Sequence, residues 1–459
     1  MRAVLIAAAH KSSGKTTLAV GITGALHRKG HQVQSFKKGP DYIDPMWLSL
    51  ASRGSCYNLD FHTMDAEAIR EMFSLRSRVA DRVIVEGNKG LFDGIDVEGS
   101  DSNAALASLL DLPVVLVIDA VGMTRGIAPL ILGYSKFGAE LDIVGVILNK
   151  VGGIRHEQKL RRSLEYYTDV PVLGAVGFDK TIGIKERHLG LMPTNELPSA
   201  QQKIKKLAQL ASSCIDFDKM FPRDRTSTAS PSISARGITK DVRIAVATDA
   251  AFGFYYPDDL EALELAGAQI VPFSAIEEKE LPDADGLFIG GGFPEECGEL
   301  LSANKALRME IRGRLESGFP AYAECGGLMY LCRSIVWNSD YFEMVGFFPA
   351  DAVMNENPVG RGYVHLRETG LSPWPGTAKG QEIFAHEFHY ASLKGIPDST
   401  QYAYDVIRGY GIDGKRDGVV LENLVANFAH QRNIGNNLWA ERFVEFVRSV
   451  KRQKINYFN

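Results

Sequence analysis

The sequence predicts an α/β protein with two domains, the first of them built on a parallel sheet. Its 459 residues are enough for roughly two to three domains. In both halves, short β-branched runs alternate with longer helical patterns, and in the first half the continuous apolar runs are typical of parallel strands covered by helices on both faces. A Ser- and Thr-rich stretch at 224–241, DRTSTASPSISARGITKD, interrupts the alternation and reads as a linker. We therefore expect one domain over residues 1–223 and a second over 242–459.

Apolar runs mark the strands of the first domain. We expect these strands at residues 3–9, 32–37, 82–87, 113–119, 143–150 and 172–177. Helical patterns fill the gaps between them. The first of these helices, TTLAVGITGALHRKG at 16–30, follows almost directly on the first strand. This order predicts a parallel sheet in which each strand is followed by a crossover helix.

The same alternation restarts after the linker. We expect strands at 242–249, 269–274 and 286–292, with helices near 258–267 and 306–318. The next strand-like stretch, FPAYAEC, ends at Cys325, and a further helix follows it. The second domain is therefore also predicted to be α/β.

Composition and charge exclude several classes of function. The net charge of −5 and the pI near 6.1 leave no basic surface for nucleic acid and no polybasic segment for a membrane. No apolar run approaches the roughly 18–20 residues of a membrane helix. The cysteines form no CxxC pair, so they read as reduced thiols of a cytoplasmic protein.

The strongest local motif is AHKSSGKTT at residues 9–17. A predicted strand precedes it and a predicted helix follows it, the context in which backbone amides of a P-loop bind phosphates. The strict pattern has glycine where this chain has Ala9, and an ordinary strand–helix turn is the alternative. We expect ATP to be bound here, by Ser13, Gly14, Lys15, Thr16 and Thr17.

Acidic side chains follow two other strands of the same predicted sheet. Asp41 and Asp44 lie in KKGPDYIDP, and Glu86 ends the strand at 82–87. The carboxyl ends of parallel strands meet at one edge of a sheet, so these groups are expected near the P-loop. A hydroxyl with one or two carboxylates suits Mg²⁺, so we expect Thr16, Asp41 and Glu86 to hold it. Lys37 is a second candidate cation for a transferred phosphoryl group.

The second domain carries a candidate nucleophile. Cys325 lies between a strand and a helix, in YAECGGLMYL, and this is the arrangement of a nucleophile elbow. The glycines of FIGGGFPE at 288–295 could direct backbone amides at an oxyanion. A thiolate also needs a histidine partner, and HEFHY at 386–390 and ANFAH at 426–430 both offer one. The alternative is that Cys325 is a small buried core residue.

These motifs together resemble the cobyrinic acid a,c-diamide synthase family along essentially the whole chain. The matching stretches, in order, are SSGKTT, FKKGPDYIDP followed by YNLD, VEGNKGLFDG, LNKVGG, FIGGGFPEE, YAECGGLMYL, RGY and HEFHY. The resemblance implies an ATP-dependent amide-forming domain similar to dethiobiotin synthetase, followed by a class I glutamine amidotransferase domain. It also implies the reaction, in which ATP and glutamine convert the a- and c-acetate side chains of a cyclic tetrapyrrole to amides.

The resemblance assigns roles to single residues. Cys325 would be the nucleophile, the amides of Gly292 and Gly326 the oxyanion hole, and His430 the general base. His389 is the second candidate for the base. In the first domain the resemblance implies adenine recognition by Asn149 and substrate binding by Asp41, Tyr42 and Asp44. It supplies no third acid for the catalytic cysteine and histidine.

The chain departs from the family pattern in three places, and the first two, in the expected tetrapyrrole-binding domain, leave the acceptor open. Asn88–Lys89 replaces an apolar pair, SRGSC at 52–56 replaces a different turn, and NFAHQR at 427–432 lacks a second histidine. The expected acceptor is cobyrinic or hydrogenobyrinic acid, and siroheme or (nickel-)sirohydrochlorin is the alternative. A ParA/MinD-like ATPase is a remote alternative, because His10 stands where that class has a signature lysine. Whether the chain forms a homodimer is left open.

Overall fold

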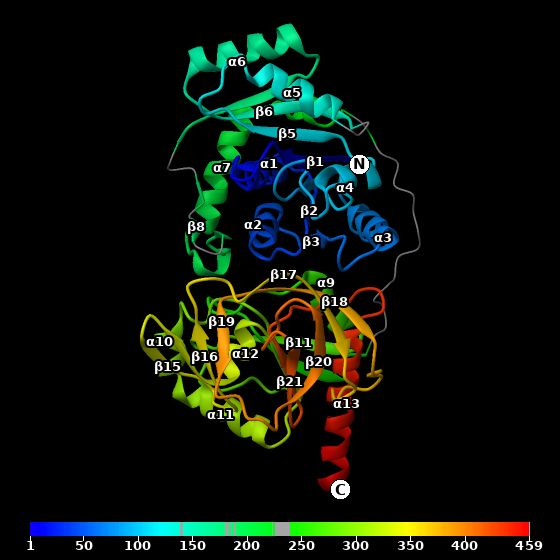
Figure 1. Ribbon diagram of the computed structural model, residues 1–459, viewed down its shortest axis with the longest axis vertical. Coiled ribbons are helices and arrows are strands. Elements are labelled where there is room, and N and C mark those ends of the chain that lie inside the picture. Colours follow the sequence, from blue (N-terminus) through cyan, green and yellow to red (C-terminus); the bar gives the residue numbers. More distant parts are fainter. Residues whose placement is uncertain are drawn as a thin grey trace. The chain divides into compact units, whose positions relative to one another are not determined.

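The computed structural model describes residues 1–137, 141–179, 183, 184, 186, 187, 190–222, 224 and 239–458. The chain forms two compact units, Met1–Ser232 and Ile233–Asn459 (Figure 1), and each has its own apolar core. Most of the predicted linker lies outside the described residues, so its conformation stays a prediction. Within the described part of the chain, no helix is both long and apolar enough to cross a membrane.

The first unit is built on a parallel sheet with the strand order β3-β2-β4-β1-β5-β6-β7. The strands are β1 Arg2–Ala8, β2 Val33–Lys38, β3 Cys56–Leu59, β4 Arg82–Glu86, β5 Val114–Asp119, β6 Ile143–Val151 and β7 Val172–Gly177. All six predicted strands are present. The sequence pattern missed β3, since the short stretch CYNL has too few β-branched residues to stand out. Two short strands, β8 Glu186–Arg187 and β9 Gly190–Leu191, form a separate pair.

Helices connect the strands of the first unit (Figure 1). They are α1 Lys15–Arg28, α2 Ile43–Ser52, α3 Ala66–Ser77, α4 Asn103–Leu109, α5 Ile127–Lys136, α6 Ile154–Tyr167, α7 Ala200–Cys214 and α8 Phe217–Met220, with a 3-10 turn at Thr194–Glu196. Helix α7 packs closely on α1, because Gly21 and Gly24 leave room for it. A Cβ atom on Gly21 would lie only 2.9 Å from the carbonyl oxygen of Leu207. This packing helps to hold α1, and with it the P-loop, against the sheet.

The second unit has a mixed sheet in the order β11-β10-β12-β13-β22-β21-β20-β17-β18. The parallel half consists of β10 Val242–Ala247, β11 Ala268–Phe273, β12 Gly286–Ile289, β13 Ala321–Glu324 and β22 Leu424–Asn427. The antiparallel half consists of β17 Gly360–Glu368, β18 Glu382–His389, β20 Gln401–Arg408 and β21 Arg416–Leu421. The α/β fold class is therefore confirmed for this unit, and its sheet is half parallel and half antiparallel. Its second half has no crossover helices, so its strands pair by direct reversal.

A smaller sheet and several helices complete the second unit (Figure 1). The sheet has β14 Cys332–Trp337, β15 Asp340–Glu343, β16 Phe348–Met354 and β19 Ala391–Lys394. The helices are α9 Pro257–Leu265, α10 Gly298–Ala303, α11 Lys305–Glu316, α12 Gly326–Leu331 and α13 Trp439–Phe458. In the parallel half of the large sheet, strand β10 is packed on both faces. In β10, Ala245 belongs to one apolar core, and its neighbours Ile244 and Val246 belong to the other, as the alternation of a strand requires.

Candidate active sites

The P-loop connects β1 to α1, as predicted. Gly14 precedes the helix in the left-handed conformation, with φ 85°, which glycine adopts at little cost. A side chain at Gly14 would also collide with Asn149, whose Nδ2 would lie 2.2 Å from the added Cβ atom. Asn149 donates a hydrogen bond from Nδ2 to the carbonyl oxygen of Ser13, at 2.8 Å. Asn149 therefore supports the loop, and its role in adenine recognition stays a prediction.

The hydroxyl of Thr16 meets two of the predicted acids. It donates to Glu86 Oε1 at 2.5 Å and lies 3.2 Å from Asp44 Oδ2. Thr16 is in the first turn of α1, and Glu86 ends β4, which is the neighbour of β1 in the sheet. The expected convergence at the carboxyl edge of the sheet is thus found. Thr17, next in the same turn, is half-buried.

Lys37, at the end of β2, is the cation at the centre of this cluster. Its ammonium group is buried and forms ion pairs with Asp44, with Glu86 at 3.3 Å and with Asp41 at 3.9 Å. Burial opposes the charge, but these three carboxylates together raise the pKa of Lys37 above its ordinary value. Lys37 therefore stays protonated and can offer positive charge to a phosphoryl group.

The other charges at this edge are shifted by burial. Burial and the neighbouring Asp44 raise the pKa of Asp41 to about 7. Burial also raises the pKa of Glu86, although Lys37 opposes the rise. Burial and the nearby Lys37 lower the pKa of Lys15. Carboxylates that crowd together in this way are stabilised by an added cation.

The donor set fits Mg²⁺ held jointly with phosphates. In the described part of the chain, no cluster of three or more His, Cys, Asp or Glu residues is arranged to hold a metal ion by itself. Mg²⁺ rarely needs such a cage, since it keeps several waters and takes one or two carboxylates plus phosphate oxygens. The hydroxyl of Thr16 beside the carboxylates of Glu86 and Asp44 meets that smaller requirement.

Asn58 supports the acidic loop and was not predicted. It lies in β3, and its Nδ2 donates to the carbonyl oxygens of Gly39 and Asp41, both at 2.8 Å. Tyr42, which follows Asp41 and precedes α2, is largely buried. The sequence did contain a signal for Asn58. It lies in YNLD, one of the stretches that match the family, but no role was assigned to that stretch. Asn58 therefore fixes the position from which Asp41 and Asp44 face the P-loop.

In the second unit, Cys325 occupies the sharp turn between β13 and α12. Its φ of 48° and ψ of −102° are unusual for a residue with a side chain, and its backbone NH bonds to the carbonyl oxygen of Asn427 at 2.7 Å. The thiol is largely buried, and its Sγ lies 4.0 Å from the carbonyl oxygen of Phe388. Burial and the nearby Glu295 raise the pKa of the Cys325 thiol. The thiol therefore needs a base to remove its proton.

The predicted oxyanion-hole glycines lie against each other. A Cβ atom on Gly326 would come within 3.1 Å of the backbone nitrogen of Gly292, so the two backbones meet at the elbow. The preceding glycine, Gly291, packs on His430, whose Cε1 would lie 2.5 Å from an added Cβ atom. The glycine turn thus brings together the oxyanion-hole candidates and the candidate base.

His430 follows β22, and its main chain pairs with that of His386 in both directions, at 2.7 and 3.2 Å. The two imidazole rings stack with centroids 4.9 Å apart. Its Nδ1 faces Glu324 Oε2 at 3.5 Å, while its Cε1 and Nε2 face Gly291. His430 therefore presents one ring nitrogen to a buried carboxylate and the other to the glycine turn.

His389, the second candidate base, is held by other groups. Its Nδ1 lies 2.8 Å from the carbonyl oxygen of Ala391, its Nε2 lies 3.4 Å from Glu387, and its ring stacks on Phe428 at 3.9 Å. Glu387 in turn accepts hydrogen bonds from the backbone of Tyr410 and its neighbour Gly411. Burial alone would raise the pKa of Glu387, but these bonds and His389 lower it. The pair of His389 and Glu387 therefore has a structural role, since His389 packs on Phe428, two residues before His430.

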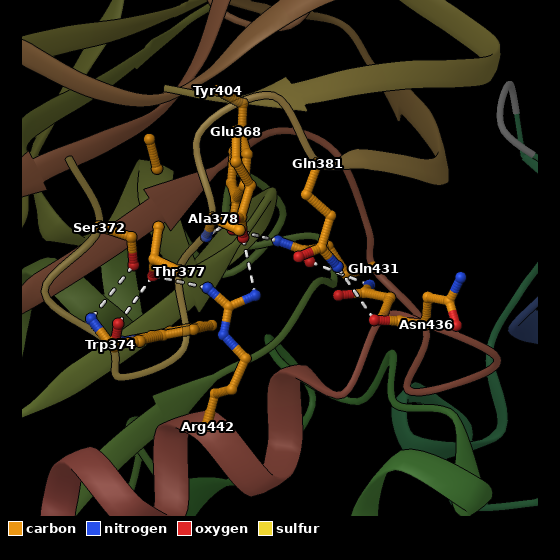
Figure 2. Close-up of polar contacts among 12 residues, drawn as sticks. Glu368, Ser372, Trp374, Thr377, Ala378, Gln381, Tyr404, Gln431, Asn436 and Arg442 are labelled. Atoms are coloured by element: carbon orange, nitrogen blue, oxygen red, sulfur yellow. Dashed lines mark hydrogen bonds and ion pairs between the residues drawn. The ribbon is translucent and has the colours of Figure 1, made fainter. Parts of the chain in front are cut away.

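The residues after His430 anchor its segment. Gln431 donates from Nε2 to the hydroxyl of Tyr404 at 2.8 Å, and Arg432 is buried in an ion pair with Asp258 at 2.6 Å. Figure 2 shows Gln431 and Tyr404 beside a second polar cluster, in which Arg442 pairs with a buried glutamate, Glu368. The sequence did not reveal these anchors, because their partners lie far away along the chain.

Comparison with known proteins decides the family. Residues 4–191 match the model of a CobQ/CobB/MinD/ParA nucleotide binding domain, and residues 243–437 match that of a CobB/CobQ-like glutamine amidotransferase domain. A cobyrinate a,c-diamide synthase of Magnetococcus marinus is 43% identical over 97% of this chain and 97% of its own. The chain belongs to the cobyrinate a,c-diamide synthase family.

Another family member is similar over most of its length. The cobyrinate a,c-diamide synthase of Methanosarcina acetivorans is 37% identical over 96% of this chain and 94% of its own. A solved crystal structure of a glutamine amidotransferase matches with a TM-score of 0.34 and 19% identity, covering 45% of this chain and 98% of its own.

Membership of the cobyrinate a,c-diamide synthase family confirms the predicted fold class and class of enzyme. The protein is an amide-forming ligase with a nucleotide-binding domain for ATP and an amidotransferase domain for glutamine. The expected resemblance to this family is likewise confirmed along nearly the whole chain.

Proposed function

We propose that the protein amidates the a- and c-acetate side chains of cobyrinic or hydrogenobyrinic acid through an acyl-phosphate intermediate. The chain is similar over nearly its full length to proteins named cobyrinate a,c-diamide synthase, and this similarity supports the proposed acceptor. The mechanism rests on two separate sites. One is the phosphate loop with the buried cation Lys37 near it, and the other is the Cys325 turn, which meets the same run of glycines as His430.

The acceptor carboxylate is activated in the first domain. A carboxylate oxygen attacks the γ-phosphorus of ATP, the bond to the β,γ-bridging oxygen breaks, and ADP leaves. Lys15 and Lys37 neutralise charge on the transferred group, while the backbone of residues 13–17 cradles the phosphates. Thr16 and Glu86, together with the carboxylates of Asp41 and Asp44, would hold Mg²⁺, which supplies further positive charge at the phosphates.

Ammonia is generated in the second domain. His430 takes the thiol proton through Nε2, and Cys325 Sγ attacks the side-chain amide carbon of glutamine. The amides of Gly292 and Gly326 stabilise the resulting oxyanion. The C–N bond then breaks, His430 returns the proton to the leaving nitrogen, and water hydrolyses the thioester to glutamate. Ammonia displaces phosphate from the acyl phosphate to form the amide.

The test is a product assay by mass spectrometry. Purified protein receives ATP, Mg²⁺ and amide-¹⁵N-labelled glutamine with cobyrinic acid, sirohydrochlorin, nickel-sirohydrochlorin or siroheme in separate reactions. We expect two labelled amides on the corrin and none on the other acceptors. Amidation of a sirohydrochlorin or of siroheme alone would overturn the proposed acceptor and retain the mechanism. Lack of glutamine hydrolysis with every acceptor would overturn the roles of Cys325 and His430.

A further inference from the structure

Glu324, the residue immediately before the candidate nucleophile, takes no part in the proposed steps of glutamine hydrolysis. It ends β13 and is 3% exposed. Its Oε2 faces His430 Nδ1 at 3.5 Å. A distance of 3.5 Å is at the outer limit of a hydrogen bond, and such contacts in ligand-free sites often tighten when substrate binds.

The other oxygen of Glu324 is held firmly. The hydroxyl of Tyr322 donates to Oε1 at 2.6 Å, and the backbone NH of Gln431 donates to the same atom at 2.9 Å. Tyr322 is on the same strand, two residues earlier, and Gln431 follows His430. The carboxylate is therefore fixed both to its own strand and to the segment that carries the histidine, with Oε2 left to face the imidazole.

The neighbouring acids have other partners. Asp417 accepts hydrogen bonds from the backbone of Phe428 and Ala429. Glu387 accepts them from Tyr410 and the adjacent glycine. The residues that follow His430 supply an amide and a guanidinium rather than a carboxylate. In residues 239–458, Glu324 is thus the carboxylate that pairs with the ring of His430.

We propose that Glu324 is the positioning residue for His430, supplying the third acid of the amidotransferase site from the position before the nucleophile. Its carboxylate accepts the Nδ1–H of the imidazole, so that Nε2, on the side of the glycine turn, carries no proton and can take that of the Cys325 thiol. It also stabilises the imidazolium that forms after that transfer. This inference rests on the proposed roles of Cys325 and His430.

The discriminating variant is Glu324→Gln. Its Oε1 can still accept both hydrogen bonds from Tyr322 and Gln431, but its amide NH₂ would donate toward Nδ1 and select the wrong tautomer. We expect kcat for glutamine hydrolysis to fall about 10²–10⁴-fold with KM nearly unchanged, by analogy with the loss of an orienting carboxylate in serine proteases. Synthesis with added ammonia should keep the wild-type rate.

Two controls separate positioning from general destabilisation. Glu368→Gln changes another buried acid of the same sheet, one that pairs with Arg442 and lies in the cluster of Figure 2. We expect it to lower the melting temperature and leave kcat for glutamine unchanged. The second control is the double variant. Adding Glu324→Gln to His430→Ala should not lower kcat for glutamine any further, because the effects of replacing residues that act as a unit are not additive.

The outcomes distinguish this inference from the function on which it rests. Wild-type kcat in a folded Glu324→Gln protein, or a full additional loss in the His430→Ala background, would overturn it. If Glu324→Gln does not fold, Glu324→Asp keeps the charge but withdraws it by one methylene, and kcat should fall about tenfold or more with KM retained. Unchanged kcat in Glu324→Asp would count against the inference. Wild-type protein that hydrolyses no glutamine would overturn the proposed function itself.

Discussion

The backbone NH of Cys325 bonds to the carbonyl oxygen of Asn427 at 2.7 Å. This bond joins the nucleophile turn to the end of β22, three residues before His430, although about a hundred residues separate the two segments. The parallel register of β13 and β22, in which Glu324 pairs with Asn427, produces it. Two neighbouring parallel strands therefore deliver the candidate nucleophile and its base to the same edge of the sheet.

Replacing Cys325 should separate the two half-reactions. Cys325→Ala removes the nucleophile, so glutamine-dependent synthesis should fall to background. Synthesis with added ammonia should continue, because the activation of the carboxylate does not use the thiol. Product formation with each nitrogen source is the measurement, and Cys332→Ala, another buried cysteine of the same unit, is the control. Full glutamine-dependent synthesis by Cys325→Ala would rule out this nucleophile.

Replacing Lys15 should have the opposite pattern. Lys15→Ala removes a cation of the P-loop, so synthesis should fall about 10³-fold or more with glutamine and with ammonia alike. Lys11→Ala changes an exposed lysine of the same loop and should leave both rates near wild type. A Lys15→Ala protein that still uses ammonia at the wild-type rate would contradict the assignment of the phosphate site.

Both the stability of the fold and the binding of nucleotide should depend on pH through Asp41. Burial and Asp44 raise the pKa of this carboxyl to about 7. The same carboxyl titrates near 3.9 in an unfolded chain. Between about pH 4 and pH 7 the folded protein holds a proton that the unfolded chain lacks, so this group's contribution to stability declines as pH rises through that window.

Binding of Mg²⁺ with a non-hydrolysable ATP analogue has the opposite dependence. It requires the ionised carboxylate, so affinity should strengthen up to about tenfold per unit from about pH 5 to 7 and then level off. Titration calorimetry in buffers of different ionisation enthalpy should detect the released proton. Asp41→Asn should bind more weakly and release none, whereas an unchanged proton release in this variant would exclude Asp41 as its source.

A methyl group on Gly291 should displace His430. The added Cβ atom would lie 2.5 Å from the imidazole Cε1, and a misplacement on the order of 1 Å can cost about 10²-fold in rate. We expect that loss in glutamine hydrolysis by Gly291→Ala, with ammonia-dependent synthesis retained. Gly313→Ala, in the middle of α11 with open space around it, is the matched control. Wild-type glutamine hydrolysis by Gly291→Ala would show that the ring need not occupy this position.

Much of the fold followed from local pattern. The strands of the first unit and the turn around Gly14 were predictable because continuous apolar runs and a GKTT motif carry their own signals. The antiparallel half of the second sheet was not predictable in the same way. Its strands pair in antiparallel fashion, and no feature of the local sequence of β17 or β20 specifies which strand each of them pairs with.

By itself the sequence determined the two α/β domains, the family and the residue types that the chemistry requires. Only the tertiary structure decided how those residues act. Asn149 supports the P-loop, His389 is held by Glu387 and Phe428, and Glu324 faces His430. The physical reason is that a side chain's role depends on which partners share its buried, low-dielectric surroundings. Those partners come from strands that are neighbours in the sheet and distant in the chain.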